Sequence, residues 1–502
     1  MGFSFNFSEK LEGKEDFVAR SYDPYVALLV ASTAFLLFYY ARLRKSRPSS
    51  TTSTEGGSKA RVDKPTNANA NREWGEWKPV NFSYPEFPAC TENLSDVKPI
   101  PYRPFRWGQY HVTMGIRDMP WADWVELDND FASYFAIRNH RIHSRGEGVL
   151  QILPDRPGIV NSARHAGASR AVFARAGVLT VDLSVAVELA HELSAFVAKR
   201  HPETFSVTKS SSGAITAIKI QIDAVDVEME LPPPLVEQDS EELTLREVGQ
   251  EEAEQAMRVC ALLVQDDLAL MVEGVDGRYY FQGGAICIPG FWRMRDKIGL
   301  PLDEIHITGH VPQYEEKLQT SLERYFKRLP VHKPVIRNNY FMQIVKPEEH
   351  RRKGAVPSDI PPQKEDEDLL DPHELAWSTT TNGNEDTFTH GHPANPDSQP
   401  TVVPETLQFR TERQTLRRLP LSGAIVFTIR TYLVPIVELG KEPGVPARLA
   451  SAVRSWPQGI GRYKGRRNYE GVLLEYLDKC AEEQRLAGGE DLEKSKGRGF
   501  PY

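Results

Sequence analysis

Cysteine is scarce in this chain, with four residues among 502, at positions 90, 260, 287 and 480. No two of them form a Cys-x-x-Cys pair, and no Cys/His spacing of a zinc site is present. These absences argue against a disulfide framework, an iron–sulfur cluster and a structural zinc site. Widely scattered cysteines are typical of a protein in a reducing compartment.

Several other signatures are also missing. The sequence contains no G-x-G-x-x-G or G-x-x-x-x-G-K-[ST] nucleotide motif, no G-x-S-x-G elbow of a serine hydrolase, no kinase signature set and no H-E-x-x-H zinc motif. The net charge of −8 argues against a general nucleic-acid-binding protein, because phosphate binding needs a basic face and only short stretches here are basic.

One long apolar run is present near the N-terminus. Residues 24–41 carry no charge, and four basic residues follow at once, Arg42, Arg44, Lys45 and Arg47. At 1.5 Å per residue the run spans about 26 Å, which suits the thinner endoplasmic-reticulum membrane. We therefore expect a single uncleaved transmembrane helix with the body of the protein in the cytosol, the side that basic flanking residues favour. A buried helix is the alternative.

Composition shifts divide the rest of the chain. Residues 47–71 are polar and rich in Ser, Thr and Asn, which predicts a flexible tether. A second polar stretch, rich in Pro and acidic residues, is too long for a loop inside a core and predicts a disordered surface insertion. The predicted order is an N-terminal segment (1–23), the membrane helix (24–41), a flexible linker (42–76), the first part of a folded domain (77–350), the insertion (351–404), the second part of that domain (405–485) and a tail (486–502).

The periodicity of apolar residues predicts both helices and strands in the folded parts. Two apolar runs flank the turn Gly-Val-Asp-Gly (274–277), which predicts a hairpin. Sequential strands with clustered helices predict an α+β fold on an antiparallel sheet rather than a parallel one. Helices are predicted at 182–200, within 241–264, at 291–298 and from Pro312 to Leu329; strands are predicted within 205–231 and at 265–273, 278–289, 334–345, 407–413 and 423–433.

Two histidines four positions apart are the first candidate site residues. His306 lies between Ile305 and Ile307 at the end of a stretch that we interpret as extended. In that geometry its ring faces away from the isoleucines, where a neutral imidazole could ligate a metal or haem iron. His310 precedes Val311-Pro312 at the entrance of the predicted helix. For both, a hydrogen-bonded loop histidine is the alternative.

The segment RTERQTLRRLP (410–420) is the second candidate, with four arginines and one glutamate. In a strand, positions 410, 412 and 414 share one face and positions 411, 413 and 415 share the other. One face would form ion pairs while the other offers guanidinium groups to an anion such as a carboxylate or a propionate. A solvated charged sheet edge is the alternative.

Six blocks of sequence carry a family resemblance when they are taken together and in order. They are VQDDLALM (264–271), GGAICIPGFWRMRDKIGLPLDEIH (283–306), VPQYEEKLQTSLERYFKRL (311–329), PVIRNNYF (334–341), RTERQTLRRLPLSGAIVFTIRTYLVP (410–435) and YKG (463–465). With these blocks the chain resembles the haem-dependent oxidative N-demethylase alpha-subunit-like family, in particular its fungal members called HRQ family proteins. The resemblance covers roughly residues 97–484 without the insertion.

The resemblance implies a PAS-like antiparallel sheet with flanking helices that carries haem b on a histidine. The Ile-His-x-x-x-x-Val-Pro pattern of the family falls on His306, which is then the expected iron ligand, with His310 as the fallback. Arg337 matches the arginine of the Arg-x-Asn-Trp block, although Tyr340 stands here where the family has tryptophan. The arginine-rich strand matches closely, so the candidates for the haem propionates or the pocket edge are Arg413, Gln414 and Arg417.

The function that the resemblance implies is oxidation of a methylated amine with dioxygen, which yields the demethylated amine and formaldehyde. The two electrons would come from a separate flavin or iron–sulfur reductase, because this chain has no motif for either cofactor. Two alternatives remain open: a haem-binding PAS-like sensor or haem carrier that catalyses nothing, and a membrane-tethered interaction protein whose site has decayed.

Overall fold

The computed structural model describes residues 69, 72–73, 76–154, 181–236, 245–290, 292–347, 375–389 and 400–488. All of them belong to one unit, Asn67–Tyr502. The predicted N-terminal segment and membrane helix lie outside the described residues. Within the described part of the chain, no helix is both long enough and apolar enough to serve as a membrane span.

A seven-stranded antiparallel sheet forms the centre of this unit, in the order β1-β8-β9-β10-β6-β7-β2. The predicted antiparallel α+β fold is therefore confirmed. The five strands in the middle of the sheet, β6 to β10, are longer than the two at its edges. Among these five, β6 is first along the chain and β10 is last, and these two strands lie side by side. The strands are β1 (Arg117–Asp118), β2 (Leu150–Ile152), β6 (Asp267–Glu273), β7 (Tyr279–Ala285), β8 (Val335–Ile344), β9 (Leu407–Arg418) and β10 (Ile425–Pro435).

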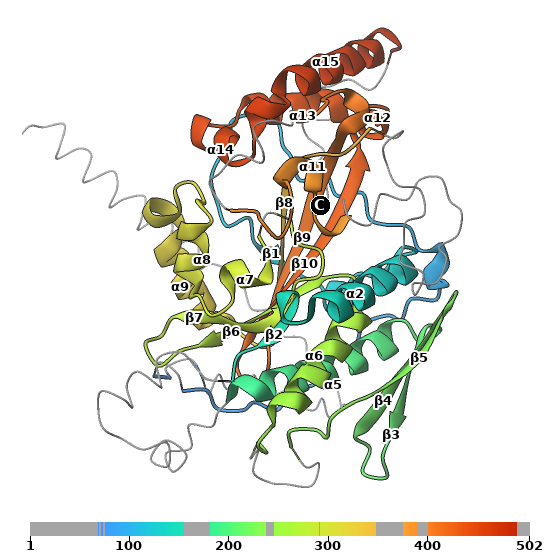
Figure 1. Ribbon diagram of the computed structural model, residues 1–502, viewed down its shortest axis with the longest axis vertical. Helices are drawn as coiled ribbons and strands as arrows, with labels where there is room; N and C mark the ends of the chain where they lie inside the picture. The colour runs from blue at the N-terminus through green and yellow to red at the C-terminus, as the bar shows by residue number, and fades with distance from the viewer. Residues whose placement is uncertain are drawn as a thin grey trace, which may run out of the picture. The chain divides into compact units, whose positions relative to one another are not determined.

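The helices gather in three groups around this sheet (Figure 1). One group packs on one face through an apolar cluster that contains Leu302 and Phe326, and a second packs on the other face through a larger cluster that contains Leu189 and Met257. The first group is α7 (Met294–Lys297), α8 (Leu302–Thr308) and α9 (Gln319–Arg328); the second is α2 (Phe131–Arg145), α5 (Val181–Arg200) and α6 (Gln250–Leu263); the third is α12 (Ile436–Leu439), α13 (Val445–Arg454), α14 (Gln458–Tyr463) and α15 (Glu470–Leu486).

A small second sheet lies beside α5. Strands β3 (Phe205–Lys209), β4 (Ile215–Ile222) and β5 (Val225–Glu230) form an antiparallel meander, which is the predicted strand region 205–231. The predicted hairpin at 265–289 is also confirmed, because β6 pairs with β7 across Gly277, whose φ of 81° suits the tight turn. The predicted helix at 182–200 corresponds to α5.

Two local predictions near the candidate histidines are wrong. The stretch around His306 is helix α8, because Pro301 stands at its N-cap and two acidic residues, Asp303 and Glu304, favour its first turn. The next helix does not begin at Pro312. Gln313 adopts φ 61°, and the chain then enters a π-helix, Tyr314–Leu318, which leads into α9.

The polar insertion predicted at 351–404 contains a folded piece. Residues 375–389 include α11 (Thr379–Asn382), and Trp377 is only 1% exposed. Arg141 of α2 forms an ion pair of 2.8 Å with Glu385, and Asn382 donates to the carbonyl of Gly290 at 3.1 Å. A buried tryptophan and a paired carboxylate anchor this segment although its composition resembles that of a linker.

The predicted linker 42–76 also ends too late. Arg72 is buried and donates from Nη1 to Oε1 of Glu273 at 2.8 Å, so it is attached to the end of β6. Asn69 is buried too, and its side chain donates to the carbonyl of Lys78. A charged or amide side chain in polar sequence is compatible with burial when a partner elsewhere in the fold completes its hydrogen bonds.

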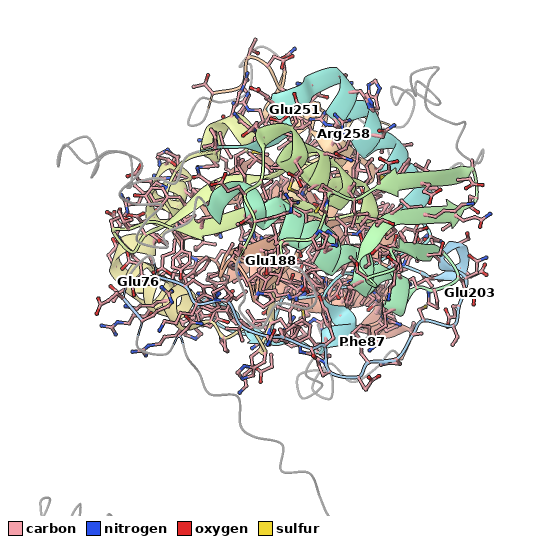
Figure 2. The ribbon with its side chains drawn as sticks, turned by 90° about the horizontal axis from the view of Figure 1, so that it is seen from below. Glu76, Phe87, Glu188, Glu203, Glu251 and Arg258 are labelled. Atoms are coloured by element: carbon pink, nitrogen blue, oxygen red, sulfur yellow. The ribbon has the colours of Figure 1, made fainter. Side chains whose placement is uncertain are left out.

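Buried charge also ties α5 to the main sheet. Glu188 is buried and accepts the backbone N–H groups of Leu421 and Ser422, in the turn between β9 and β10, at 2.6 and 2.8 Å. Figure 2 shows Glu188 in the middle of the view, whereas Glu76 and Glu203 lie toward its edges. Burial raises the pKa of Glu188 to about 7 although the two N–H groups favour the carboxylate.

The buried pair Arg430–Asp128 provides a stability test. The two groups lie 2.8 Å apart and are 1% and 4% exposed. Arg430→Leu should lower the free energy of unfolding by about 3–5 kcal/mol, because Asp128 then stays buried without its cation. Urea denaturation of the purified protein measures this loss.

The surface pair Lys441–Glu438 serves as the control, with side chains 71% and 55% exposed. Lys441→Ala should change the free energy of unfolding by less than about 1 kcal/mol, because water screens the exposed pair. Losses of similar size in the two variants would contradict this account of the buried charges.

Candidate functional site

Helix α8 holds His306 in a fixed position. Lys297 of α7 caps the C-terminal end of α8. Its ammonium donates to the carbonyl of Ile305 and to Oγ1 of Thr308, both at 3.0 Å. Lys297 is only 2% exposed, and a cation at this end is favourable for the helix dipole. Leu302 and Ile305 pack into the apolar cluster of this sheet face, so the helix is attached on one side by charge and on the other by apolar contact.

The tautomer of His306 follows from its hydrogen bond. Nδ1 lies 2.6 Å from the carbonyl oxygen of Leu302, and because a carbonyl can only accept, Nδ1 carries the proton. Nε2 then keeps its lone pair, and no hydrogen bond to Nε2 is formed within the described residues. Partial burial, with the nearby charges of Arg337 and Lys297, lowers the pKa of His306 to about 4. The imidazole is therefore neutral at physiological pH and suited to ligate a metal.

Tyr314 lies flat against the His306 ring. The ring centroids are 4.6 Å apart and the planes differ by 7°, which is a stacked arrangement. Tyr314 is 1% exposed, yet its hydroxyl makes no hydrogen bond in the described structure. Burial, with the charges of Asp303 and Glu323, raises the pKa of this hydroxyl well above its ordinary value.

The connection between His306 and Tyr314 is strained. His310 has φ 53° and Gln313 has φ 61°, in the left-handed region that residues with a Cβ seldom adopt. Each such residue costs on the order of 1–2 kcal/mol. The two left-handed residues reverse the chain, and this reversal places Tyr314 over His306. His310 itself is exposed, so the structure does not bring it to the same place as His306.

Polar side chains on the facing sheet surface form the other side of the site. The register sets Arg337 of β8 opposite Gln414 of β9, and Asn339 opposite Glu412, so all four lie on the face that α7–α9 cover. Phe427 lies on this face of β10, a central strand, and is still partly exposed. A half-buried aromatic side chain at the centre of a sheet indicates that the helices do not fill the space above it.

Arg337 is the unsatisfied cation of this face. It forms no ion pair or hydrogen bond within the described residues, and its Nε is buried without a partner. Burial lowers the pKa of Arg337, and the charge of Glu412 opposes that decrease. A guanidinium in this state is suited to bind a carboxylate, since a planar, charged donor fork pairs with two oxygens.

Glu412 is surrounded by cations and donors. Gln414 donates to its Oε2 at 3.1 Å, and Arg410 Nε lies 3.7 Å from Oε1. Gly290 passes directly over it, because a Cβ at that position would lie 3.0 Å from Oε1 of Glu412. Glycine at 290 therefore allows the loop after β7 to close over this part of the sheet.

Lys464 reaches this cluster from the C-terminal helices. It is 6% exposed, donates to the carbonyl of Tyr340, and lies 3.4 Å from the side-chain oxygen of Asn339. Burial lowers the pKa of its ammonium to about 7, an effect that Glu412 opposes and Arg337 strengthens. The sequence alone did not indicate Lys464 as a site residue, although the block YKG contains it. A lysine between a tyrosine and a glycine carries no signal by itself.

Arg413 and Arg417 lie on the opposite face of the sheet. Both are fully buried; Arg413 Nε is 2.9 Å from Glu126, and Arg417 pairs with Glu192 of α5. The alternation of β9 separates them from Gln414, so the structure brings together His306, Arg337 and Gln414 but not the two arginines.

Tyr340, which stands where the resemblance leads one to expect tryptophan, also lies on that opposite face. Its ring packs against Phe105, Phe409 and Trp456. The tyrosine therefore belongs to the apolar cluster under α12–α15 rather than to the surface that faces His306.

The donor set fits haem better than a chelated metal ion. Among the described residues, no group of three or more His, Cys, Asp or Glu side chains could hold a metal. A neutral imidazole on helix α8, with a guanidinium on the facing sheet surface that has no partner among the described residues, would supply one ligand for a haem iron and one partner for an anionic propionate. The buried, unsatisfied Nε of Arg337 is the observation that supports this fit.

The lowered pKa of His306 can be measured by NMR titration with labelled histidine. We expect a midpoint near pH 4, and Arg337→Gln should raise it, because a nearby positive charge is removed. Between about pH 6.5 and 4 only the unfolded imidazole takes up a proton, so the folded protein should lose stability as the pH falls through that window.

His201 is the matched control for that titration. Its pKa is also lowered to about 4, by burial and by Arg200 rather than by Arg337. Arg337→Gln should leave the His201 midpoint in place. A His306 midpoint near 6.5, or equal movement of both signals, would contradict the site geometry.

A family model described as haem-dependent oxidative N-demethylase, alpha subunit-like, matches residues 115–474. The match includes all strands of the large sheet together with the residues of the site, among them His306, Arg337, Glu412 and Lys464.

Proposed function

This chain belongs to the haem-dependent oxidative N-demethylase alpha-subunit-like family, and from that premise we propose that it binds haem b at His306 and oxidises a methylated amine with dioxygen. The observation that carries the proposal is the neutral His306, whose Nε2 accepts no hydrogen bond within the described residues, on the side of the sheet where Arg337 has no partner among those residues. Among the residues predicted from sequence, His306, Arg337 and Gln414 remain in the proposed site, while His310, Arg413 and Arg417 do not.

The strand order supports the PAS-like character of the domain. Counted along the chain as β6, β7, β8, β9 and β10, the five longer strands lie in the order second, first, fifth, fourth, third. Helices α7–α9 form the connection between the second and third of these strands and cover one face. A five-stranded antiparallel sheet with its helices in one connection is compatible with the PAS-like fold that we propose for this domain.

The residues of the site have separable roles in this proposal. His306 would hold the iron through Nε2, while its Nδ1–H bond to Leu302 fixes the ring and increases the basicity of the ligand. Arg337, with Gln414 beside it, would bind an anionic propionate. Lys464, with a pKa of about 7, can hold or release a proton at Nζ near neutral pH. When bound, haem would supply the activation of dioxygen.

The overall reaction requires a partner protein. One N-methyl group, one dioxygen molecule, two electrons and two protons would yield the demethylated amine, formaldehyde and water. The sequence offers no flavin, NAD(P)H or iron–sulfur motif, so a separate flavin or iron–sulfur reductase would deliver the electrons. The same absence favours the second candidate, a haem-binding sensor or haem carrier that receives no electrons for turnover.

The proposal is tested first by haem binding. Full-length protein reconstituted with haem should show a Soret band, and His306→Ala should lose it, because the single protein ligand is gone. Added imidazole should restore part of the band by occupying the space of the missing side chain. Absorbance spectra at fixed protein concentration measure these changes.

His310→Asn is the matched control, since His310 is exposed and asparagine tolerates its left-handed backbone. It should bind haem as the wild type does. A colourless wild-type protein would end both haem hypotheses, and loss of the band in His310→Asn alone would assign the ligand to that residue.

Formaldehyde release then separates the enzyme from the sensor. The haem-loaded protein, dimethylamine, dioxygen and a generic ferredoxin–reductase pair should release formaldehyde, and His306→Ala should release none above the rate without protein. A wild-type protein that binds haem but releases no formaldehyde with a series of methylated amines favours the sensor or carrier.

Attachment to a membrane, with the folded body in the cytosol, is part of the proposal and is supported by sequence alone. Residues 24–41 are uncharged and are followed by basic residues. The full chain should remain in the membrane pellet after alkaline carbonate extraction, and deletion of residues 24–41 should release it. Complete extraction of the full chain would overturn the anchor.

A further inference from the structure

Tyr314 is buried but belongs to none of the three apolar clusters formed by the described residues. Its one contact among the described aromatic rings is the stack on His306. Its hydroxyl makes no hydrogen bond within the described residues, so no hydrogen bond explains why a tyrosine is buried at this position. The stack on the imidazole is the specific contact that the described residues give to its ring.

The backbone around Tyr314 is arranged to form that stack. Two of the three non-glycine residues with positive φ in the described chain, His310 and Gln313, lie in the four residues before it. Tyr314 itself opens a π-helix, a rare conformation that occurs often at functional sites. Strain of this kind persists only where the surrounding structure enforces it.

The hydrogen bond to Leu302 alone does not fix the imidazole. It restrains Nδ1 at one point, about which the ring plane can still tilt. An aromatic ring parallel to the imidazole at 4.6 Å restrains the plane as well. Together the two contacts leave one direction for the Nε2 lone pair.

We propose that Tyr314 is a positioning residue that holds the imidazole plane of His306, and thereby the direction of its bond to iron. The inference rests on the proposed haem ligation by His306. The aromatic face of Tyr314 performs this role, and the hydroxyl does not, so phenylalanine should replace it without loss.

The experiment compares Tyr314→Leu and Tyr314→Phe in the full-length, haem-loaded protein. The rate of haem transfer to apomyoglobin should rise about two- to tenfold in Tyr314→Leu, the range expected for loss of an aromatic stack. In Tyr314→Phe it should stay within about twofold of the wild type. The Soret and charge-transfer bands should shift in the leucine variant alone.

A second readout needs no haem. In the haem-free protein, the ring protons of His306 should lie upfield because of the tyrosine ring current, and should move downfield in Tyr314→Leu but not in Tyr314→Phe. Tyr325→Leu is the matched control, because Tyr325 lies on α9 beside the apolar cluster and has no stack with His306. It should leave the haem-transfer rate and the His306 signals unchanged.

The outcomes separate this inference from the proposed function. If the wild-type chain binds no haem, both the proposed function and the positioning role of Tyr314 are overturned. Normal haem binding with equal transfer rates in the wild type and Tyr314→Leu overturns the inference alone, as does a phenylalanine variant that behaves like leucine. If Tyr314→Leu does not fold, Tyr314→Met replaces it; failure of both to fold, while Tyr314→Phe folds, would assign Tyr314 to structure and overturn the positioning role.

Discussion

Strand β9 imposes the constraint on which the rest of the structure depends, because it carries four arginines into the interior. Arg410, Arg413, Arg417 and Arg418 are each at most 1% exposed. A buried guanidinium without partners costs several kcal/mol, so each must be matched from another part of the chain. Glu126 and Glu192 pair with two of them, and backbone carbonyls and Thr431 accept from the others. The buried charges thus connect the N-terminal loops, α5 and the end of α9 to one strand.

The two faces of β9 have different roles: one carries arginines that stabilise the fold, and the other carries residues of the candidate site. Successive side chains of a strand point to opposite faces, so the two arginines paired with glutamates face α2, α5 and α6, while Glu412 and Gln414 face α8. On the first face the charges are neutralised within the fold. On the second face, Arg337 has no partner in the part of the chain that the structure describes, and burial lowers the pKa of Lys464. The charges on the first face therefore stabilise the fold, and the second face is the one on which we propose that haem binds.

Much of the fold could be predicted because local periodicity was strong. The hairpin β6–β7, helix α5 and strands β8, β9 and β10 all lie where apolar spacing placed them. The prediction of an extended backbone at His306 was wrong. Two isoleucines on either side of a histidine resemble the alternation of a strand, but the helix-start signals at Pro301 and Asp303 favoured α8. The prediction of disorder for residues 375–389 was wrong for a different reason. Their composition is polar, and their order comes from Trp377 and from the pairing of Glu385 with Arg141, which is more than 200 positions away.

The sequence by itself determined the antiparallel α+β class, the family and the presence of an arginine-rich strand with two distinct faces. These follow from spacing along the chain and from ordered blocks of residues, both of which are local properties. Only the tertiary structure decided which face meets His306, that Tyr314 lies on its ring, and that Glu412 and Lys464 join Arg337. Pairing between distant strands and the burial of charge depend on long-range contacts, and no window of sequence contains both members of such a contact.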